Sequence, residues 1–232
     1  MKENIIGLVL GIKFARSFRV SDISGDIIDH ILNDEQSPFE PSIFPRIQEN
    51  SRREKTLYND ETSEYLRINT DDIILGITVD KNFETKYEWL KNKVLPYFKE
   101  HLMLKFKINN ITRIGVVFIH RITKNKKINE SIGLLTNEAV KDVENVSVSF
   151  SKKAPTTEAL YRKNVNDYKN VIYNFVEIEN ELQASLDYQY YYSPAVADLR
   201  ECSSEKVLED AKALLENNYY SWLDKYEIKE SK

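Results

Sequence analysis

Apolar side chains recur along the chain with two periods, about two residues and about 3.6 residues, which are typical of strands and helices respectively. Alternating or unbroken apolar runs between polar clusters predict extended segments. These segments cover residues 5–15, 55–59, 64–79, 111–122, 146–150, 171–178 and 184–192. Apolar residues three or four apart predict helices over residues 21–33, 83–107, 128–139 and 203–222.

Polar clusters and prolines interrupt these patterns. The polar cluster at 69–72 predicts a turn that makes residues 64–79 a hairpin. Residues 34–52 contain three prolines and no clear period, so we expect a long connection there. Pro96 is predicted to kink or divide the helix over 83–107, because proline removes a backbone donor and crowds the preceding turn. Residues 154–166 fit neither pattern.

The predicted elements follow the order β, α, β, β, α twice. Each series opens on a similar apolar segment, IGLVLGIK at residues 6–13 and IGVVFIHR at residues 114–121. The fold class that follows most simply is α+β, with an antiparallel sheet and helices packed on one face. We hypothesise a duplicated β-α-β-β-α unit with a pseudo-twofold axis. Its halves would be residues 1–109 and 110–232, which could form one continuous domain.

Composition excludes several classes of protein. The 232 residues are 41% hydrophobic, which is enough for a packed core. Cys202 is the only cysteine, so an internal disulfide and a cysteine-rich metal site are excluded. The six glycines are scattered singly, without the clusters that cradle phosphates, so we expect no nucleotide cofactor. No other cofactor is predicted from the sequence. No apolar run has the length of a membrane span, and no signal peptide is evident; the expected location is the cytoplasm, without membrane contact.

Charge is distributed unevenly along the chain. Residues 111–170 hold 11 basic and 6 acidic side chains, whereas residues 171–232 hold 6 and 13. Such asymmetry can mark an anion-binding face or two faces that attract each other in the fold or in an oligomer. Basic residues after predicted strands form a candidate phosphate-contacting rim for a nucleic-acid backbone. They are Arg121, Lys124, Lys126, Lys127, Lys152, Lys153, Arg162 and Lys163, which could equally be solvated loop residues.

Tyrosines are concentrated near the start of the acidic region. In a strand, Tyr188, Tyr190 and Tyr192 would project from one face. Three rings there could stack on bases or anchor a protein partner. The alternative is that they pack beneath a helix or across the sheet.

His120 and Arg121 are weak candidates for catalysis. At a strand end, an imidazole could transfer a proton while a guanidinium stabilises phosphate charge, as a metal-independent ribonuclease requires. No second acid or base is evident beside them. A Cys202 nucleophile lacks any local signature. The chain is therefore more simply interpreted as a protein without catalytic activity.

No metal site is expected. The three histidines lie far apart in the sequence, without the helical spacing of a zinc pair. The adjacent Asp71 and Asp72 lie in a predicted turn and should point in different directions, which suits turn residues better than ligands.

Residues 113–122, RIGVVFIHRI, resemble a strand motif of a sporadically distributed family of uncharacterised bacterial proteins. In that family the strand runs Arg, aliphatic, Gly, Leu, Arg, Tyr, variable, Asn, Arg, aliphatic. Leu186 and Asp187 resemble the same family's Leu-Asp pair. Val117, Phe118 and His120 depart from the motif, at the positions of its Arg, Tyr and Asn. The resemblance implies no established activity.

The first functional hypothesis is a cytosolic bacterial accessory protein that works through a protein partner or a homo-oligomer. A defence or mobile-element locus would be one setting for it, including antiviral defence. The second hypothesis is a nucleic-acid-binding protein that uses the basic loops, and the third is the ribonuclease-like enzyme.

Overall fold

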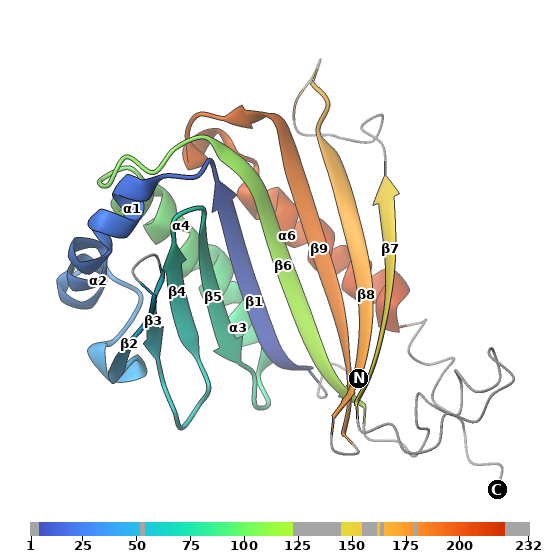
Figure 1. Ribbon diagram of the computed structural model, residues 1–232. Helices are drawn as coiled ribbons and strands as arrows, with labels where there is room; N and C mark the ends of the chain where they lie inside the picture. Colours follow the sequence, from blue (N-terminus) through green and yellow to red (C-terminus); the bar gives the residue numbers. More distant parts are fainter. Residues whose placement is uncertain are drawn as a thin grey trace, which may run out of the picture.

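The computed structural model describes residues 5–51, 54–122, 145–154, 162, 165–178 and 181–220. Within them, nine strands form one antiparallel sheet in the order β2-β3-β4-β5-β1-β6-β9-β8-β7 (Figure 1). The strands are β1 (Ile5–Phe14), β2 (Arg46–Ser51), β3 (Glu54–Tyr58), β4 (Tyr65–Asn69), β5 (Asp72–Thr78), β6 (Ile111–Ile122), β7 (Asn145–Ala154), β8 (Tyr168–Ile178) and β9 (Glu181–Val196). The predicted α+β class is confirmed.

The helices of the first half lie after β1 and after β5, and those of the second half lie after β9. The first half holds α1 (Phe18–Asp22), α2 (Ser24–Asn33), the short 3-10 turn η2 (Pro41–Ile43) and a long helical segment. That segment comprises α3 (Phe83–Trp89), η3 (Leu90–Val94), α4 (Leu95–Tyr97) and η4 (Phe98–Met103). The second half ends in η6 (Leu199–Glu201), α6 (Ser204–Leu214) and η7 (Leu215–Tyr219). Figure 1 shows α3, α4 and α6 together on one face of the sheet, as expected.

The core lies between the sheet and this helical layer. On β1, Leu8, Leu10 and Ile12 are fully buried, while Val9 and Gly11 between them are only partly buried. The same alternation on β6 buries Val116 and Phe118. Because successive strand residues point to opposite faces, one side of each strand meets the helices and the other does not.

The two central strands carry the echoed sequences. β1 pairs antiparallel with β6, and Val9 lies opposite Val117, which is also its counterpart in the echo. In each half the last strand, β5 or β9, lies beside the first, β1 or β6, and a helix follows. This arrangement is compatible with a twofold through the Val9–Val117 pair, although the described residues form five strands in the first half and four in the second. The duplication itself stays a hypothesis.

Ion pairs connect the helical layers of the two halves. Lys91 Nζ lies 2.6 Å from Glu209 Oε1, and Lys99 Nζ lies 2.5 Å from Glu205 Oε1. A third pair joins Lys212 to Glu84. The order of these contacts makes the two helical segments antiparallel. The acidic end of the chain is therefore partly balanced by lysines of the first half.

The structure differs from the predicted elements at several places. The hairpin within residues 64–79 is present as β4 and β5, but the supposed connection over 34–52 contains η2 and β2. The expected helix over 21–33 is divided into α1 and α2. Pro96 does not end its helix; segments with wider π turns, η3 and η4, lie on either side of it and accommodate its missing donor.

Two sequence predictions cannot be located in this structure. The expected helix over 128–139 lies outside the described residues, as does most of the ambiguous segment 154–166. Within the described part of the chain, no helix is long and apolar enough to cross a membrane.

Candidate binding interface

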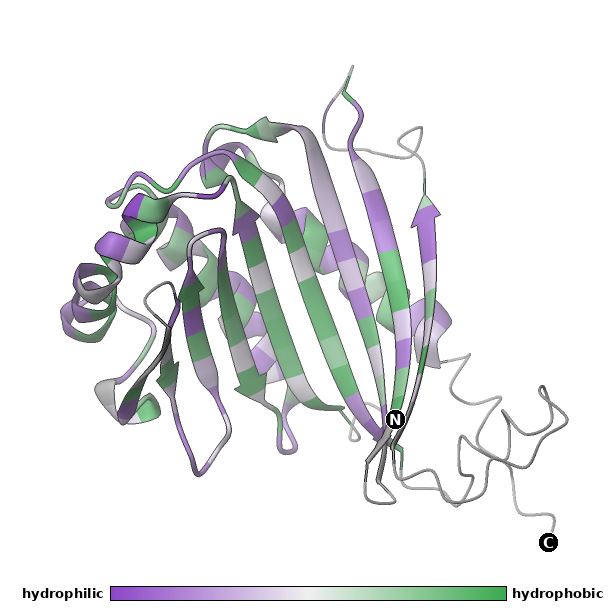
Figure 2. Cartoon of the chain, viewed as in Figure 1, coloured by the Kyte–Doolittle hydropathy of each residue, from purple (hydrophilic) through white to green (hydrophobic). Residues whose placement is uncertain are grey.

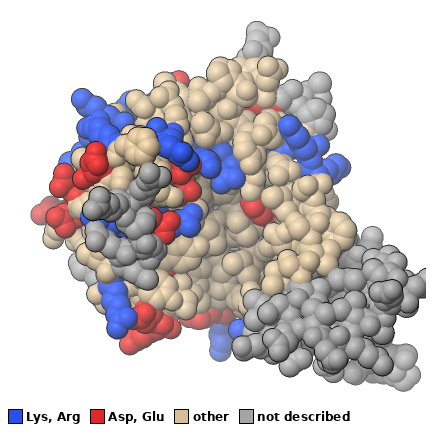
Figure 3. Space-filling view, viewed as in Figure 1, with Lys and Arg blue, Asp and Glu red and all other residues tan. Residues whose placement is uncertain are grey.

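One face of the sheet carries no helix among the described residues; we call it the open face. It is the side onto which Val9, Ile74, Val117, Ile119 and Ile172 project, each partly buried. Figure 2 shows β1 and β6 as hydrophobic along most of their length, so apolar residues face both sides at the centre of the sheet. Figure 3 shows a largely uncharged, hollowed middle on this face, with lysines and arginines gathered toward its upper part.

Cations flank a pair of tyrosines across one end of the open face. Lys13 lies opposite Arg113, Arg113 opposite Tyr191, and Tyr191 opposite Tyr168. The rings of Tyr191 and Tyr168 are stacked, with centroids 4.5 Å apart and an interplanar angle of 8°. Arg113 lies 5.6 Å from the Tyr191 ring and Lys153 lies 3.9 Å from the Tyr168 ring. These five residues form the cation–tyrosine row.

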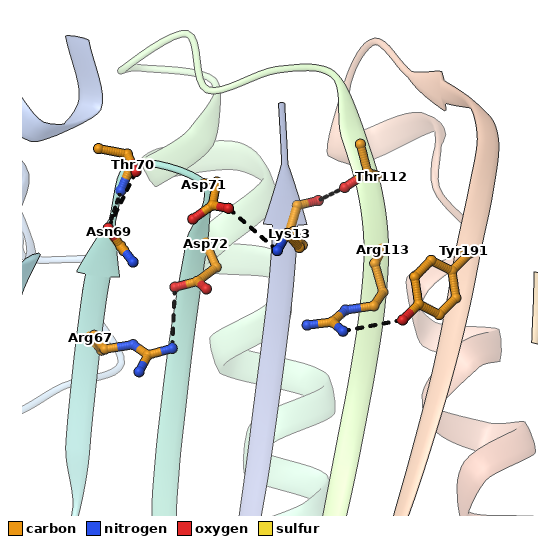
Figure 4. A network of polar contacts seen from close by, with 9 residues as sticks. All are labelled: Lys13, Arg67, Asn69, Thr70, Asp71, Asp72, Thr112, Arg113 and Tyr191. Atoms are coloured by element: carbon orange, nitrogen blue, oxygen red, sulfur yellow. Dashed lines mark hydrogen bonds and ion pairs between the residues drawn. The ribbon is translucent and has the colours of Figure 1, made fainter. Parts of the chain in front are cut away.

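Carboxylates accompany the cations on this face. Lys13 Nζ lies 3.3 Å from Asp71 Oδ2, and Arg67 NH2 lies 3.5 Å from Asp72 Oδ1 (Figure 4). Burial raises the pKa of Asp72, and the Arg67 charge opposes that rise. Asp71 and Asp72, where β4 turns into β5, thus each pair with a basic residue. The sequence predicted a turn at these two positions.

A chain of hydrogen bonds links the row to a partly buried carboxylate. Arg113 NH1 donates to Tyr191 Oη at 3.3 Å, and Tyr191 Oη donates to Gln189 Oε1 at 2.8 Å. Gln189 Nε2 then donates to Asp187 Oδ2 at 2.6 Å. Burial raises the pKa of Asp187, while the Gln189 bond and the Arg113 charge lower it. These contacts hold Tyr191 and Gln189 in defined positions on the open face.

The pair proposed for catalysis is divided between two faces. His120 is 2% exposed and packs against Tyr219 and Tyr220 on the helix side, at centroid distances of 5.0 and 5.7 Å. Arg121 is exposed on the open face. Because consecutive strand residues point in opposite directions, the two side chains cannot act on one substrate. The ribonuclease hypothesis therefore loses its geometric basis.

The tyrosines proposed as a partner-binding surface face the helices. Tyr188, Tyr190 and Tyr192 are 2%, 1% and 4% exposed, and all belong to the core. The sequence placed them correctly on one face, but that face is the covered one, so their rings offer no surface to a partner. Tyr191 lies between two of them in the strand, so its side chain points to the opposite, open face.

The basic residues proposed as a rim have different environments. Lys152 and Lys153 lie within β7 and not in a loop, and only Lys153 belongs to the cation–tyrosine row. Arg162 is engaged by the fully buried Asp167: its Nε donates to Oδ2 at 2.9 Å, and its NH2 contacts Oδ1. Its role in this structure is to neutralise a buried charge. Lys124, Lys126, Lys127 and Lys163 lie outside the described residues.

The Asp167 cluster holds the end of β9 against the start of β8. Besides Arg162, the carboxylate accepts from Tyr190 Oη at 3.0 Å and from the Ser193 backbone N–H at 2.7 Å. The bonds from Arg162, Ser193 and Tyr190 oppose the effect of burial and keep the pKa of Asp167 below its usual value. The cluster is a structural anchor that the sequence did not reveal.

A pocket of about 270 Å³ lies between α3, β5 and the η2 region. Its lining is mainly apolar, with Phe44, Leu75 and Trp89, and Lys86 Nζ lies 3.0 Å from Glu64 Oε1 at this site. Among the described residues, no group of three His, Cys, Asp or Glu side chains is placed to hold a metal ion.

No family model and no curated protein matches the chain. Solved structures that match it include Methanococcus jannaschii TBP, at 10% sequence identity. That match covers 90% of this chain and 98% of the other, with a TM-score of 0.26. A TM-score this low supports no argument about fold or function.

Proposed function

We propose that this chain is a non-catalytic binding protein whose open face docks a protein partner. The observation that supports this proposal is the apolar character of the central strands on both of their faces. Strands that consist of continuous apolar residues are typical of sheets covered on both sides. Here the helices cover one side, and Val9, Val117 and Ile119 project from the other.

The polar residues of the open face also favour a protein partner. Arginine and tyrosine are enriched at protein interfaces, where a ring or guanidinium covers apolar area and still forms hydrogen bonds. Lys13 and Arg67 each have a carboxylate within 4 Å, so this part of the face offers both signs of charge. The Tyr168 and Tyr191 rings stack on each other, which uses one face of each ring and leaves less ring surface for a nucleic-acid base.

The proposal is tested with a charge placed at the centre of the open face. Val117→Glu sets a carboxylate beside Val9, and Ala213→Glu adds the same charge at an exposed position of α6, on the helix side. Each tagged protein is used to capture partners from host-cell lysate. Any partner found is purified, and its binding is measured by isothermal titration calorimetry.

A partner that binds the open face should bind the Val117→Glu protein at least about tenfold more weakly, because an apolar contact is replaced by a desolvated charge. The Ala213→Glu protein should bind with the affinity of the original chain. Equal affinity for both variants would overturn the proposal, and so would the absence of any purified protein that binds the original chain. Thermal unfolding of both variants distinguishes a lost interface from a lost fold.

Nucleic-acid binding is a second candidate because Lys13 lies directly opposite Arg113. Like charges opposite each other on a sheet are destabilising, and a bound phosphate would relieve the repulsion. Binding of labelled RNA and DNA, followed by fluorescence anisotropy, should then weaken steeply with salt. It should also weaken in Lys13→Glu and Arg113→Glu proteins and, for the basic cluster proposed from the sequence, in Lys126→Glu and Lys127→Glu proteins. No binding at low salt would exclude this candidate.

A further inference from the structure

The edge strand β7 presents a long backbone edge. All ten of its residues pair with β8, from Asn145 opposite Ile178 to Ala154 opposite Lys169. Within the described residues no strand pairs with the other side of β7. That side therefore presents a row of backbone donors and acceptors that can extend the sheet.

Most of β7 lacks the features that usually protect such an edge, because its charged residues, Lys152 and Lys153, lie only near its C-terminal end. Its first seven residues, NVSVSFS at 145–151, contain no charge and no proline, and Phe150 is 57% exposed. The opposite edge strand β2 is six residues long and includes the charged Arg46 and Glu49. Short, charged edge strands discourage pairing with other chains, whereas long uncharged ones permit it.

We propose that β7 pairs antiparallel with β7 of a second copy of this chain. A twofold axis requires one residue to face its own copy, and the register centred on Ser149 uses the strand from Asn145 to Lys153. In that register Phe150 faces Val148, which gives an apolar pair on the side of the sheet that the helices cover. Ser147 faces Ser151 on the open side.

Charge favours an antiparallel over a parallel pairing of two copies, and the antiparallel pair is self-complementary. Lys152 and Lys153 lie at the same end of β7, so a parallel, in-register pair would place like charges side by side. The antiparallel register places them opposite Val146 and Asn145 of the other copy, neither of which is charged. The strand is thus complementary to itself only when the two copies are related by a twofold axis.

The proposal predicts a dimer of the full-length chain, measured by size-exclusion chromatography with multi-angle light scattering over a range of concentrations. Ser149→Lys and Ser149→Glu each place like charges face to face. The dimer of each variant alone should therefore have a dissociation constant at least about tenfold higher than that of the original chain. An equimolar mixture should dimerise again, because lysine then faces glutamate. Ser149→Thr, which keeps a neutral strand-forming side chain, should behave as the original chain does.

Several results would overturn the proposal. They are a monomeric original chain at every concentration, unchanged dimerisation of the Lys and Glu variants, or no recovery in the mixture. Circular dichroism shows whether each variant folds. The edge proposal is independent of the open face, since Val117→Glu should leave the dimer intact and Ser149→Lys should leave capture of a single partner molecule intact.

Discussion

Acidification should destabilise this protein through His120. The side chain is enclosed between β6 and the tyrosines that end the last helical segment, Tyr219 and Tyr220. Neither ring nitrogen has a hydrogen-bond partner among the described residues. Burial lowers the pKa of His120 to about 4, because a charged imidazolium would lose its hydration without gaining a partner. Burial raises the pKa of Tyr219, so this neighbour stays neutral in acid.

The sign and the size of the effect follow from the two pKa values of His120. In the unfolded chain the imidazole binds a proton near pH 6.5, while in the folded protein it stays neutral until about pH 4. Between these limits the unfolded state holds more protons, so stability is complete above pH 6.5 and falls as the pH drops. At about 1.4 kcal/mol for each pKa unit, the loss is about 2 kcal/mol at pH 5 and about 3 kcal/mol at pH 4.

The measurement is urea unfolding, followed by circular dichroism between pH 7.5 and pH 5. His120→Phe retains an aromatic ring in the apolar site and removes the titrating group. The original chain should lose about 2 kcal/mol more than this variant over that range. His101→Phe, at a partly exposed ring stacked on Tyr97, should keep the full loss and serves as the control. Equal pH dependence in the original chain and His120→Phe would refute the reasoning.

Further predictions concern the Asp167 cluster, the sheet and the thiol. In urea unfolding, Asp167→Asn should lower the free energy of unfolding by about 1 to 3 kcal/mol. The control Asp198→Asn changes a more exposed ion pair and should lower it by less than about 1 kcal/mol. Gly76→Ala should destabilise by about 1 kcal/mol, because an added Cβ would meet the Tyr65 ring; Tyr65→Ala in the same chain should remove that cost. Cys202, buried and with its pKa raised to about 12, should react with a thiol reagent only after unfolding.

Local patterns were sufficient to predict most strands and helices of this fold. The central strands and the 64–79 hairpin have unbroken or alternating apolar residues that specify an extended chain. β2 has no such signal, since Ile47 is the only apolar side chain in its six residues. Its conformation follows from pairing with β3, a contact that depends on the tertiary fold and not on its own sequence.

The candidate site was harder to predict, because alternation assigns side chains to a face without telling which face the helices cover. The sequence grouped Tyr188, Tyr190 and Tyr192 correctly, but the helical layer lies over them and leaves Tyr191 on the open side. The cation–tyrosine row joins β1, β6, β9, β8 and β7, and its members are neighbours only through strand pairing. A residue list made from one segment at a time cannot assemble such a row.

The open face and the β7 edge together predict how one partner could bind both copies of a dimer. If two copies join at β7, the nine described strands of each copy form one continuous sheet and the two open faces lie on the same side, because sheet extension preserves the alternation of faces. A partner with two suitably spaced sites would then bind both copies at once, with an avidity that a single site cannot supply. A monovalent partner would gain nothing from the dimer. Comparing the original chain with the Ser149→Lys protein against a partner captured by the open face therefore measures whether that partner spans both copies.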